Sequence, residues 1–315
     1  MFPLQTRGIG ETVLSTAPDV VVFLFGLVTQ LGDQWFFFLA FTSLYWLARP
    51  RISERPRRVA ASFVALAFIS LSLVTSLKVG FALPRPPTAE IASAPNWPAP
   101  LADLFVSFTT DDGFGFPSGH ALGTTVVYGA AALLLDVWDR RRRALAAAAI
   151  VATVALSRVV LGVHYGVDVV VGTLLGLVVL ILVFTVADAD DVPGHLDPTR
   201  LFALAVGLSA VALAVVIASG TPHHAANASA ALGGSLGGLV GWSRLSDHES
   251  LPTLSLPAAL VSLLGAGALW VVADALHVLP IAILATGTVV AFILAAPWIQ
   301  SRLSGDAAAG KSVEQ

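Results

Sequence analysis

Long apolar stretches separated by short polar linkers dominate the chain. A transmembrane helix needs about 20 mostly apolar residues, because the hydrocarbon core is roughly 30 Å thick and a helix rises about 1.5 Å per residue. Six stretches of this kind contain no charged residue, and four others are shorter or interrupted. The pattern predicts an all-α, polytopic membrane bundle with about ten transmembrane helices. In chain order the candidates are Pro18–Leu31, Gln34–Ala48, Val59–Leu77, Ala121–Leu135, Ala144–Ser157, Val169–Val186, Leu201–Ser219, Ala225–Ser243, Leu251–Ala273 and Val278–Ser301.

The composition agrees with a membrane protein. Hydrophobic residues make up 56% of the 315 residues and charged residues only 12%, whereas soluble domains carry roughly 25% charged residues. A net charge of −3 leaves no basic excess to follow a phosphate backbone, so we expect no nucleic-acid partner. The absence of cysteine excludes disulfides, thiolate metal ligands and a cysteine nucleophile.

The basic residues predict an orientation in the cell membrane. Two linkers, residues 49–58 and Arg140–Arg143, are rich in arginine, and the positive-inside rule places both in the cytoplasm. Alternation of the spans then places Leu83–Gly119 outside, Asp188–Thr199 inside, and both termini inside. All but three of the 17 cations fall on the cytoplasmic side under this assignment. The exceptions, which topology does not explain, are Lys78, Arg85 and Arg158.

A change in composition divides the chain. After Val186 an acidic linker leads into four spans rich in Ala, Gly and Ser. We therefore divide the chain into a core at 13–187, an acidic linker at 188–198, a C-terminal transmembrane bundle of unknown role at 199–303 and a flexible tail at 304–315. Glycines at every fourth position from Gly233 to Gly241 favour close helix packing in this bundle. The neighbouring His223 and His224 are typical of a solvated turn, and we assign them no chemistry.

The one long outer loop, from Pro84 to Pro117, carries a short apolar stretch, Leu101–Phe108, that is too short to cross a bilayer. We expect an interfacial or re-entrant helix here. At the start of the loop, Lys78 and Arg85 stand on the side where the chain otherwise avoids cations. They are either snorkelling side chains or anion ligands, and Pro86 restricts the backbone that carries the guanidinium of Arg85.

The second polar cluster is Pro117-Ser118-Gly119-His120, directly before an apolar span. One interpretation is a turn in which Ser118 caps a helix. The other uses the same unpaired N–H groups and positive dipole end of the helix as an anion site, where Gly119 permits close approach and His120 is a titratable donor.

The third cluster is Ser157-Arg158, followed by His164 and Asp168. Four residues separate His164 from Asp168, so on a helix the carboxylate would lie one turn from the imidazole and accept its second N–H. This would leave the other ring nitrogen free as a nucleophile or base. A purely structural pair is the alternative, but an ionisable pair near the membrane favours a functional site.

Together the three clusters resemble the type-2 phosphatidic acid phosphatase superfamily, whose motifs are Lys-x6-Arg-Pro, Pro-Ser-Gly-His and Ser-Arg-x5-His-x3-Asp. All eleven specified residues are present in order, and the resemblance covers Val59 to Val186. Vanadium haloperoxidases and bacterial non-specific acid phosphatases share this signature, but the apolar spans favour the membrane-bound lipid phosphatase branch.

The resemblance implies a phosphohistidine mechanism. His164 would attack phosphorus, Asp168 would orient it, and His120 would protonate the leaving oxygen. Neither a metal ion nor another cofactor is implied, although Asp111 and Asp112, just before the second cluster, leave a metal site open. The residues that the resemblance assigns to phosphate binding are Lys78, Arg85, Ser118, Gly119 and Arg158.

A site opening at the outer face of the membrane favours a lipid phosphate as substrate, with membrane lipids as its surroundings. Our first choice is a polyprenyl diphosphate, by analogy with the family. One alternative is a phosphotransferase that uses the same intermediate, and another is a non-catalytic lipid-headgroup binder or transporter. The sequence predicts neither the lipid tail nor the oligomeric state.

Overall fold

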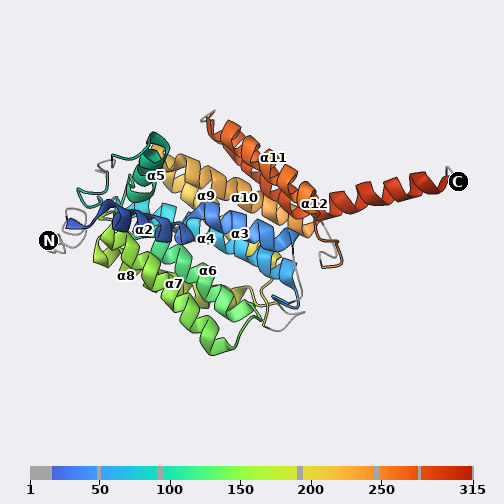
Figure 1. Cartoon of the computed structure of the whole chain (residues 1–315), viewed down its shortest axis with the longest axis horizontal. Coiled ribbons are helices and arrows are strands. Elements are labelled where there is room, and N and C mark those ends of the chain that lie inside the picture. Colours follow the sequence, from blue (N-terminus) through green and yellow to red (C-terminus); the bar gives the residue numbers. More distant parts are fainter. Residues whose placement is uncertain are drawn as a thin grey trace.

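The computed structural model describes residues 16–47, 51–90, 96–189, 194–244, 249–275 and 278–313, which form a bundle of helices (Figure 1). Apart from two isolated β-bridges, the described residues contain no strand, which confirms the all-α prediction. The helices are α2 (Asp19–Thr29), α3 (Gln34–Trp46), α4 (Pro56–Phe81), α5 (Ala99–Thr109), α6 (Gly119–Leu134), α7 (Arg140–Val160), α8 (Gly166–Val186), α9 (Pro198–Ser219), α10 (Ala225–Ser243), α11 (Leu256–Ala275) and α12 (Leu279–Val313), with 3-10 turns at Gln30–Gly32 and Pro222–His224.

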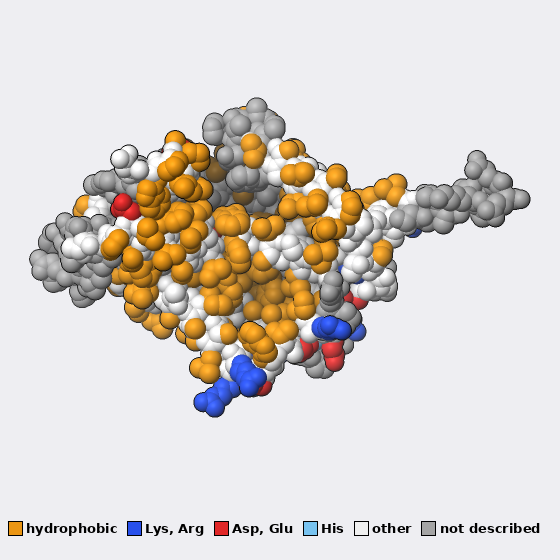
Figure 2. Space-filling model, in the orientation of Figure 1, with side chains coloured by type: hydrophobic (Ala, Val, Ile, Leu, Met, Phe, Trp, Pro, Cys, Tyr) orange, Lys and Arg blue, Asp and Glu red, His pale blue; other side chains and the backbone are white. Residues whose placement is uncertain are grey.

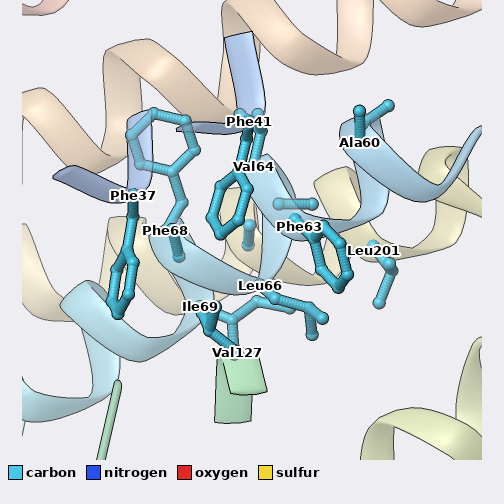
Figure 3. Packing of buried hydrophobic residues seen from close by; sticks show 14 of the residues in the cluster. Phe37, Phe41, Ala60, Phe63, Val64, Leu66, Phe68, Ile69, Val127 and Leu201 are labelled. Atoms are coloured by element: carbon cyan, nitrogen blue, oxygen red, sulfur yellow. The ribbon is translucent and has the colours of Figure 1, made fainter. Parts of the chain in front are cut away.

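Helix α4 lies at the centre of the bundle. It is apolar on all sides and almost completely buried, as expected for a helix surrounded by others. Figure 3 shows its side chains packed against Phe37 and Phe41 of α3, Val127 of α6 and Leu201 of α9. The helix therefore joins the α6–α8 layer to the layer that contains α9 and α10 (Figure 1).

The surface and the helix lengths are those of a membrane-embedded protein. Figure 2 shows a broad hydrophobic area over the middle of the molecule. Five helices in the described part of the chain are long and apolar enough to cross a membrane, or up to six if α2 and α3 together form one broken span. The predicted number of ten is not confirmed. Helix α6 has only 16 residues, and α10 is too rich in Gly and Ser to qualify by composition.

Helices α2 and α3 differ from the two separate spans that the sequence predicts. They are bent by 52° at the break around Asp33, so they continue in the same general direction instead of folding back. The start of α2 packs near the site described below, since Val22 shares a hydrophobic cluster with Leu161 and Val163. One bent crossing of this kind would leave Thr16 and the end of α12 on opposite sides of the membrane, which does not fit the prediction that both termini lie inside.

The C-terminal helices are packed tightly onto the core. A Cβ atom added to Gly233 would overlap the carbonyl group of Ile283, so the backbones of α10 and α12 touch. An added Cβ at Gly234 would overlap the Phe68 ring of α4. The close packing expected from the glycine repeat is therefore present. Helix α12 continues to Val313, well into the segment 304–315 for which a tail is predicted (Figure 1). Residues 190–193 of the acidic linker lie outside the described residues.

Candidate active site

Three segments that are far apart in the sequence meet at one end of the bundle around a cavity of about 260 Å³. They are the end of α4, the start of α6, and the turn between α7 and α8. Five of the predicted site residues line this cavity, namely Lys78, Arg85, Gly119, His120 and His164. The other three predicted residues, Ser118, Arg158 and Asp168, are buried beside it.

His164 is held at both ring nitrogens. Its Nδ1 atom lies 3.3 Å from Oδ2 of Asp168, and its Nε2 atom lies 3.1 Å from Nη1 of Arg85. A guanidinium group has only donors, so Nε2 is the acceptor and Nδ1 carries the proton that Asp168 accepts. The geometry therefore favours the tautomer in which Nε2 is unprotonated and accepts from Arg85.

The local backbone at this pair differs from the expectation. His164 does not lie on a helix. It belongs to the turn after α7, in which Gly162 has a φ of 66°, and α8 begins only at Gly166. Asp168 lies in the first turn of α8, where Oδ2 also accepts the backbone N–H of Tyr165 at 2.8 Å. Asp168 thus caps its own helix and orients the imidazole at the same time.

Arg85 is fixed by four contacts, although it lies in a loop. Its Nε donates to the carbonyl of Asp112 at 2.7 Å, and Nη1 donates to the carbonyl of Val163 at 3.0 Å as well as to His164. Its Nη2 lies 2.9 Å from Oδ1 of Asp111. The side chain is 4% exposed. These contacts hold the guanidinium rigid and leave one of its five N–H groups, on Nη2, unused by the described residues.

Asp111 bridges the two arginines of the site. Its other carboxylate oxygen contacts Nη2 of Arg158, and Nη1 of Arg158 donates to Oγ1 of Thr29 at 3.2 Å. Burial opposes ionisation of Asp111, but the adjacent Arg158 and Arg85 outweigh it and hold the pKa of Asp111 below its usual value. From the sequence alone, Asp111 is a candidate only for a metal site. Within the described residues, no three His, Asp or Glu side chains are grouped so that they could hold a metal ion.

The positive charge around His164 has a consequence for its protonation. Burial and the nearby Arg85, Arg158 and Lys78 lower the pKa of His164 well below its usual value. A neutral imidazole is the form that acts as a nucleophile. The cations that would bind a phosphate therefore also keep this nitrogen reactive.

Ser118 and Gly119 form the start of α6. Oγ of Ser118 accepts the backbone N–H of Ala121 at 3.4 Å, and its own N–H donates to the backbone carbonyl of Asp168 at 3.1 Å. The capping interpretation of Ser118 is therefore realised, whereas its hydroxyl does not line the cavity. A Cβ added to Gly172 of α8 would lie 2.6 Å from the carbonyl oxygen of Ser118, so α6 and α8 are in close contact here.

His120 faces an acidic residue that the sequence analysis did not find. Its Nε2 atom has no hydrogen-bond partner among the described residues and lies 3.8 Å from Oδ2 of Asp33. Asp33 occupies the break between α2 and α3 and also lines the cavity. A charged residue between two apolar stretches was the available signal, because ionisable groups at membrane depth usually have a function.

Residues of the C-terminal bundle complete the cavity wall. His223, His224 and Asn227 line it, and Nε2 of His223 lies 3.1 Å from Oδ1 of Asp112. The ring of His224 stacks on Phe114 with a centroid distance of 5.3 Å. Both histidines therefore lie at the rim of the site, where His224 is buried and His223 is exposed as expected for a solvated turn.

Comparisons with known proteins give one match. Residues 58–190 match the family model described as the PAP2 superfamily, which is the short name of the type-2 phosphatidic acid phosphatases. This range contains every motif residue described above and coincides closely with Val59–Val186. No curated protein matches the chain, and no solved structure does.

Proposed function

We propose that this chain, whose residues 58–190 match the PAP2 superfamily, performs phosphatase-type chemistry on phosphate esters and hydrolyses a lipid phosphate through a phosphohistidine intermediate. The observation that carries this proposal is the tautomer of His164. Asp168 accepts from Nδ1, Arg85 donates to Nε2, and His164 lines the cavity. A residue that only bound an anion would need the cations but not an oriented, unprotonated nitrogen.

The proposed first step transfers the phosphoryl group to the enzyme. Nε2 of His164 forms a bond to phosphorus while the bond between phosphorus and the lipid oxygen breaks, and His120 supplies the proton to that oxygen. The imidazole becomes positively charged, and Asp168 stabilises it. In the second step a water molecule gives its proton to His120 and attacks phosphorus, which releases phosphate and restores His164.

The phosphate charge is balanced by cations. Lys78 and Arg85 line the cavity, and Arg158 lies behind Asp111. In phosphoryl transfer most of the catalysis is positioning and charge stabilisation, for which this arrangement is suited. Asp111 neutralises part of this charge while the cavity is empty, and we propose that the substrate phosphate takes over its contacts with the two arginines.

The helix that carries His120 points its N-terminus at the cavity, as required for an anion site. Burial and the nearby Arg158 lower the pKa of His120, and Asp33, 3.8 Å away, opposes this shift. We place the site at the outer face of the membrane and name polyprenyl diphosphate as the first substrate to test, with phosphatidic acid as the second.

The test is phosphate release by the purified protein in detergent micelles that contain these two lipids. We expect wild-type protein to release phosphate and to form an acid-labile, base-stable phosphoryl adduct, and His164→Ala to do neither. Phosphate release by His164→Ala at a rate near that of wild type would refute the mechanism. A phosphorylated acceptor without free phosphate would indicate a phosphotransferase, and binding without turnover a headgroup binder or transporter.

A further inference from the structure

A second, larger cavity adjoins the candidate active site. Its volume is about 630 Å³, within the range of roughly 300–1,000 Å³ typical of small-molecule sites. Four residues line both cavities, namely Asp33, Gln34, Leu71 and Asn227. The two cavities therefore adjoin at these residues.

The lining of the second cavity is apolar and lies on one face of each helix around it. On α3 the lining residues are Trp35, Phe38, Leu39 and Thr42, which recur at helical spacing. The facing wall comes from α12, where the lining extends from Ala282 to Ile293. Beyond Asp33 and Gln34 the lining is almost entirely hydrophobic, so the polarity of the combined space falls with distance from His164.

The lining of the second cavity is about as long as the hydrocarbon layer of one membrane leaflet is thick. Along α3 it reaches from Asp33 to Thr42, which corresponds to about 14 Å at the rise of an α-helix, and along α12 from Ala282 to Ile293, about 16 Å. Half of the hydrocarbon core is roughly 15 Å. A lipid whose phosphate lies beside His164 would therefore have its chain beside this lining.

We propose that this cavity binds the hydrocarbon chain of the substrate, and that the C-terminal bundle thereby makes the enzyme selective for long-chain lipid phosphates. The proposal rests on the proposed function, because the phosphate site fixes one end of the chain. Four of the five helices around the cavity, α3, α10, α11 and α12, lie outside residues 58–190, and the last three of them belong to the C-terminal bundle. Figure 1 shows α11 and α12 at the edge of the bundle, where a lipid can enter from the membrane.

Two glycines of α11 provide a matched pair of variants. Gly267 lines the cavity and Gly265, two residues away, does not. An added Cβ meets no atom within 4 Å at either position, so both accept a β-carbon without a clash. Gly267→Phe places a ring at the cavity wall. Gly265→Phe adds the same ring to the same helix outside the cavity.

The experiment compares hexadecyl phosphate with butyl phosphate, which differ only in chain length. For Gly267→Phe we expect the ratio of kcat/KM for the long substrate to that for the short one to fall about tenfold or more. For Gly265→Phe we expect a ratio within about twofold of wild type. An unchanged ratio in Gly267→Phe, or an equal fall in both variants, would overturn the proposal.

A second measurement does not need a variant or any turnover. Hexadecyl phosphate with a photoactivatable diazirine at the end of its chain is irradiated with the wild-type protein, and the labelled peptides are identified by mass spectrometry. We expect labels on α3, α11 and α12. Labels confined to α7 and α8 would refute the tail site. If neither alkyl phosphate nor any lipid phosphate is hydrolysed, the proposed function fails, while this labelling still decides whether the cavity holds a chain.

Discussion

Replacement of Asp168 by asparagine isolates the contribution of its negative charge. In the structure a single carboxylate oxygen, Oδ2, accepts from both Tyr165 N and His164 Nδ1. The amide oxygen of asparagine has the same shape and accepts both bonds, so the tautomer of His164 is preserved. What is lost is the charge opposite the imidazolium that forms as the phosphoryl group is transferred.

The size of the effect follows from the difference between two kinds of hydrogen bond. A bond to a charged group contributes about 1.5–3 kcal/mol and a neutral one about 1 kcal/mol. The difference of about 0.5–2 kcal/mol corresponds to a fall of about 2- to 30-fold in the rate of phosphorylation. Asp168→Ala removes both bonds and leaves the ring unoriented, so we expect a larger fall of about 100-fold. His164→Ala removes the nucleophile and should abolish the adduct.

The assay is the rate of phosphoryl-adduct formation in a single turnover, followed by rapid quenching of the purified protein with labelled lipid phosphate. Asp139→Asn serves as the control, because Asp139 caps α7 at the opposite end of the bundle through Arg142 N. The reasoning would be refuted if Asp168→Asn were as inactive as His164→Ala, or if it retained the wild-type rate.

Three further predictions concern pH, metal ions and topology. Burial and the surrounding cations lower the pKa of His164. We therefore expect kcat/KM to fall only at a pH well below about 6.5, the usual pKa of histidine. Arg85→Gln removes a neighbouring positive charge and should move this acidic limb of the pH profile to higher pH. The pH profiles of both proteins check this, and an unshifted limb would contradict it. Phosphatase activity should persist in EDTA and be inhibited by vanadate, since Lys78, Arg85 and Arg158 supply positive charge to the phosphate; activity lost in EDTA and restored by Mg²⁺ would contradict this. The chain has no native cysteine, so single cysteines can be introduced and labelled. In intact cells an impermeant reagent should label Glu90→Cys and Thr16→Cys but not Arg141→Cys. The opposite pattern would invert the orientation, and protection of position 16 alone would argue against the single bent crossing of α2 and α3.

The motif residues could be predicted from the sequence because each of the three clusters is local. Spacing within a cluster places Lys78 and Arg85, or His164 and Asp168, within reach of each other whatever the rest of the chain does. The prediction that His164 and Asp168 share a helix was wrong, because Gly162 and the residues after it form a turn. The two side chains are nevertheless in contact, because Asp168 lies in the first turn of α8 and its carboxylate accepts from Tyr165 N and from the imidazole of His164.

The partners of these clusters could not be predicted in the same way. Asp33 and Asp111 are single acidic residues without a recognisable spacing, and their roles arise only when the helices meet. Three buried cations in one place require compensating charge, but the sequence does not say which carboxylate provides it. The bend between α2 and α3 was missed for a related reason, since two apolar stretches joined by a short polar break predict a hairpin and a bent crossing equally well.

The contact between α10 and α12 has a consequence for how the chain enters the membrane. Helix α10 is not apolar enough to qualify as a span by itself, and its glycines instead place its backbone against α12. Yet α12 is synthesised after α10, and at about 5–20 residues per second the ribosome needs several seconds to travel from one to the other. During that interval α10 has α9 and α4 as its main partners, and its packing is completed only when α12 arrives. A ribosome that stops before Leu279 therefore leaves the three motif clusters beside a helix that lacks its most extensive contact.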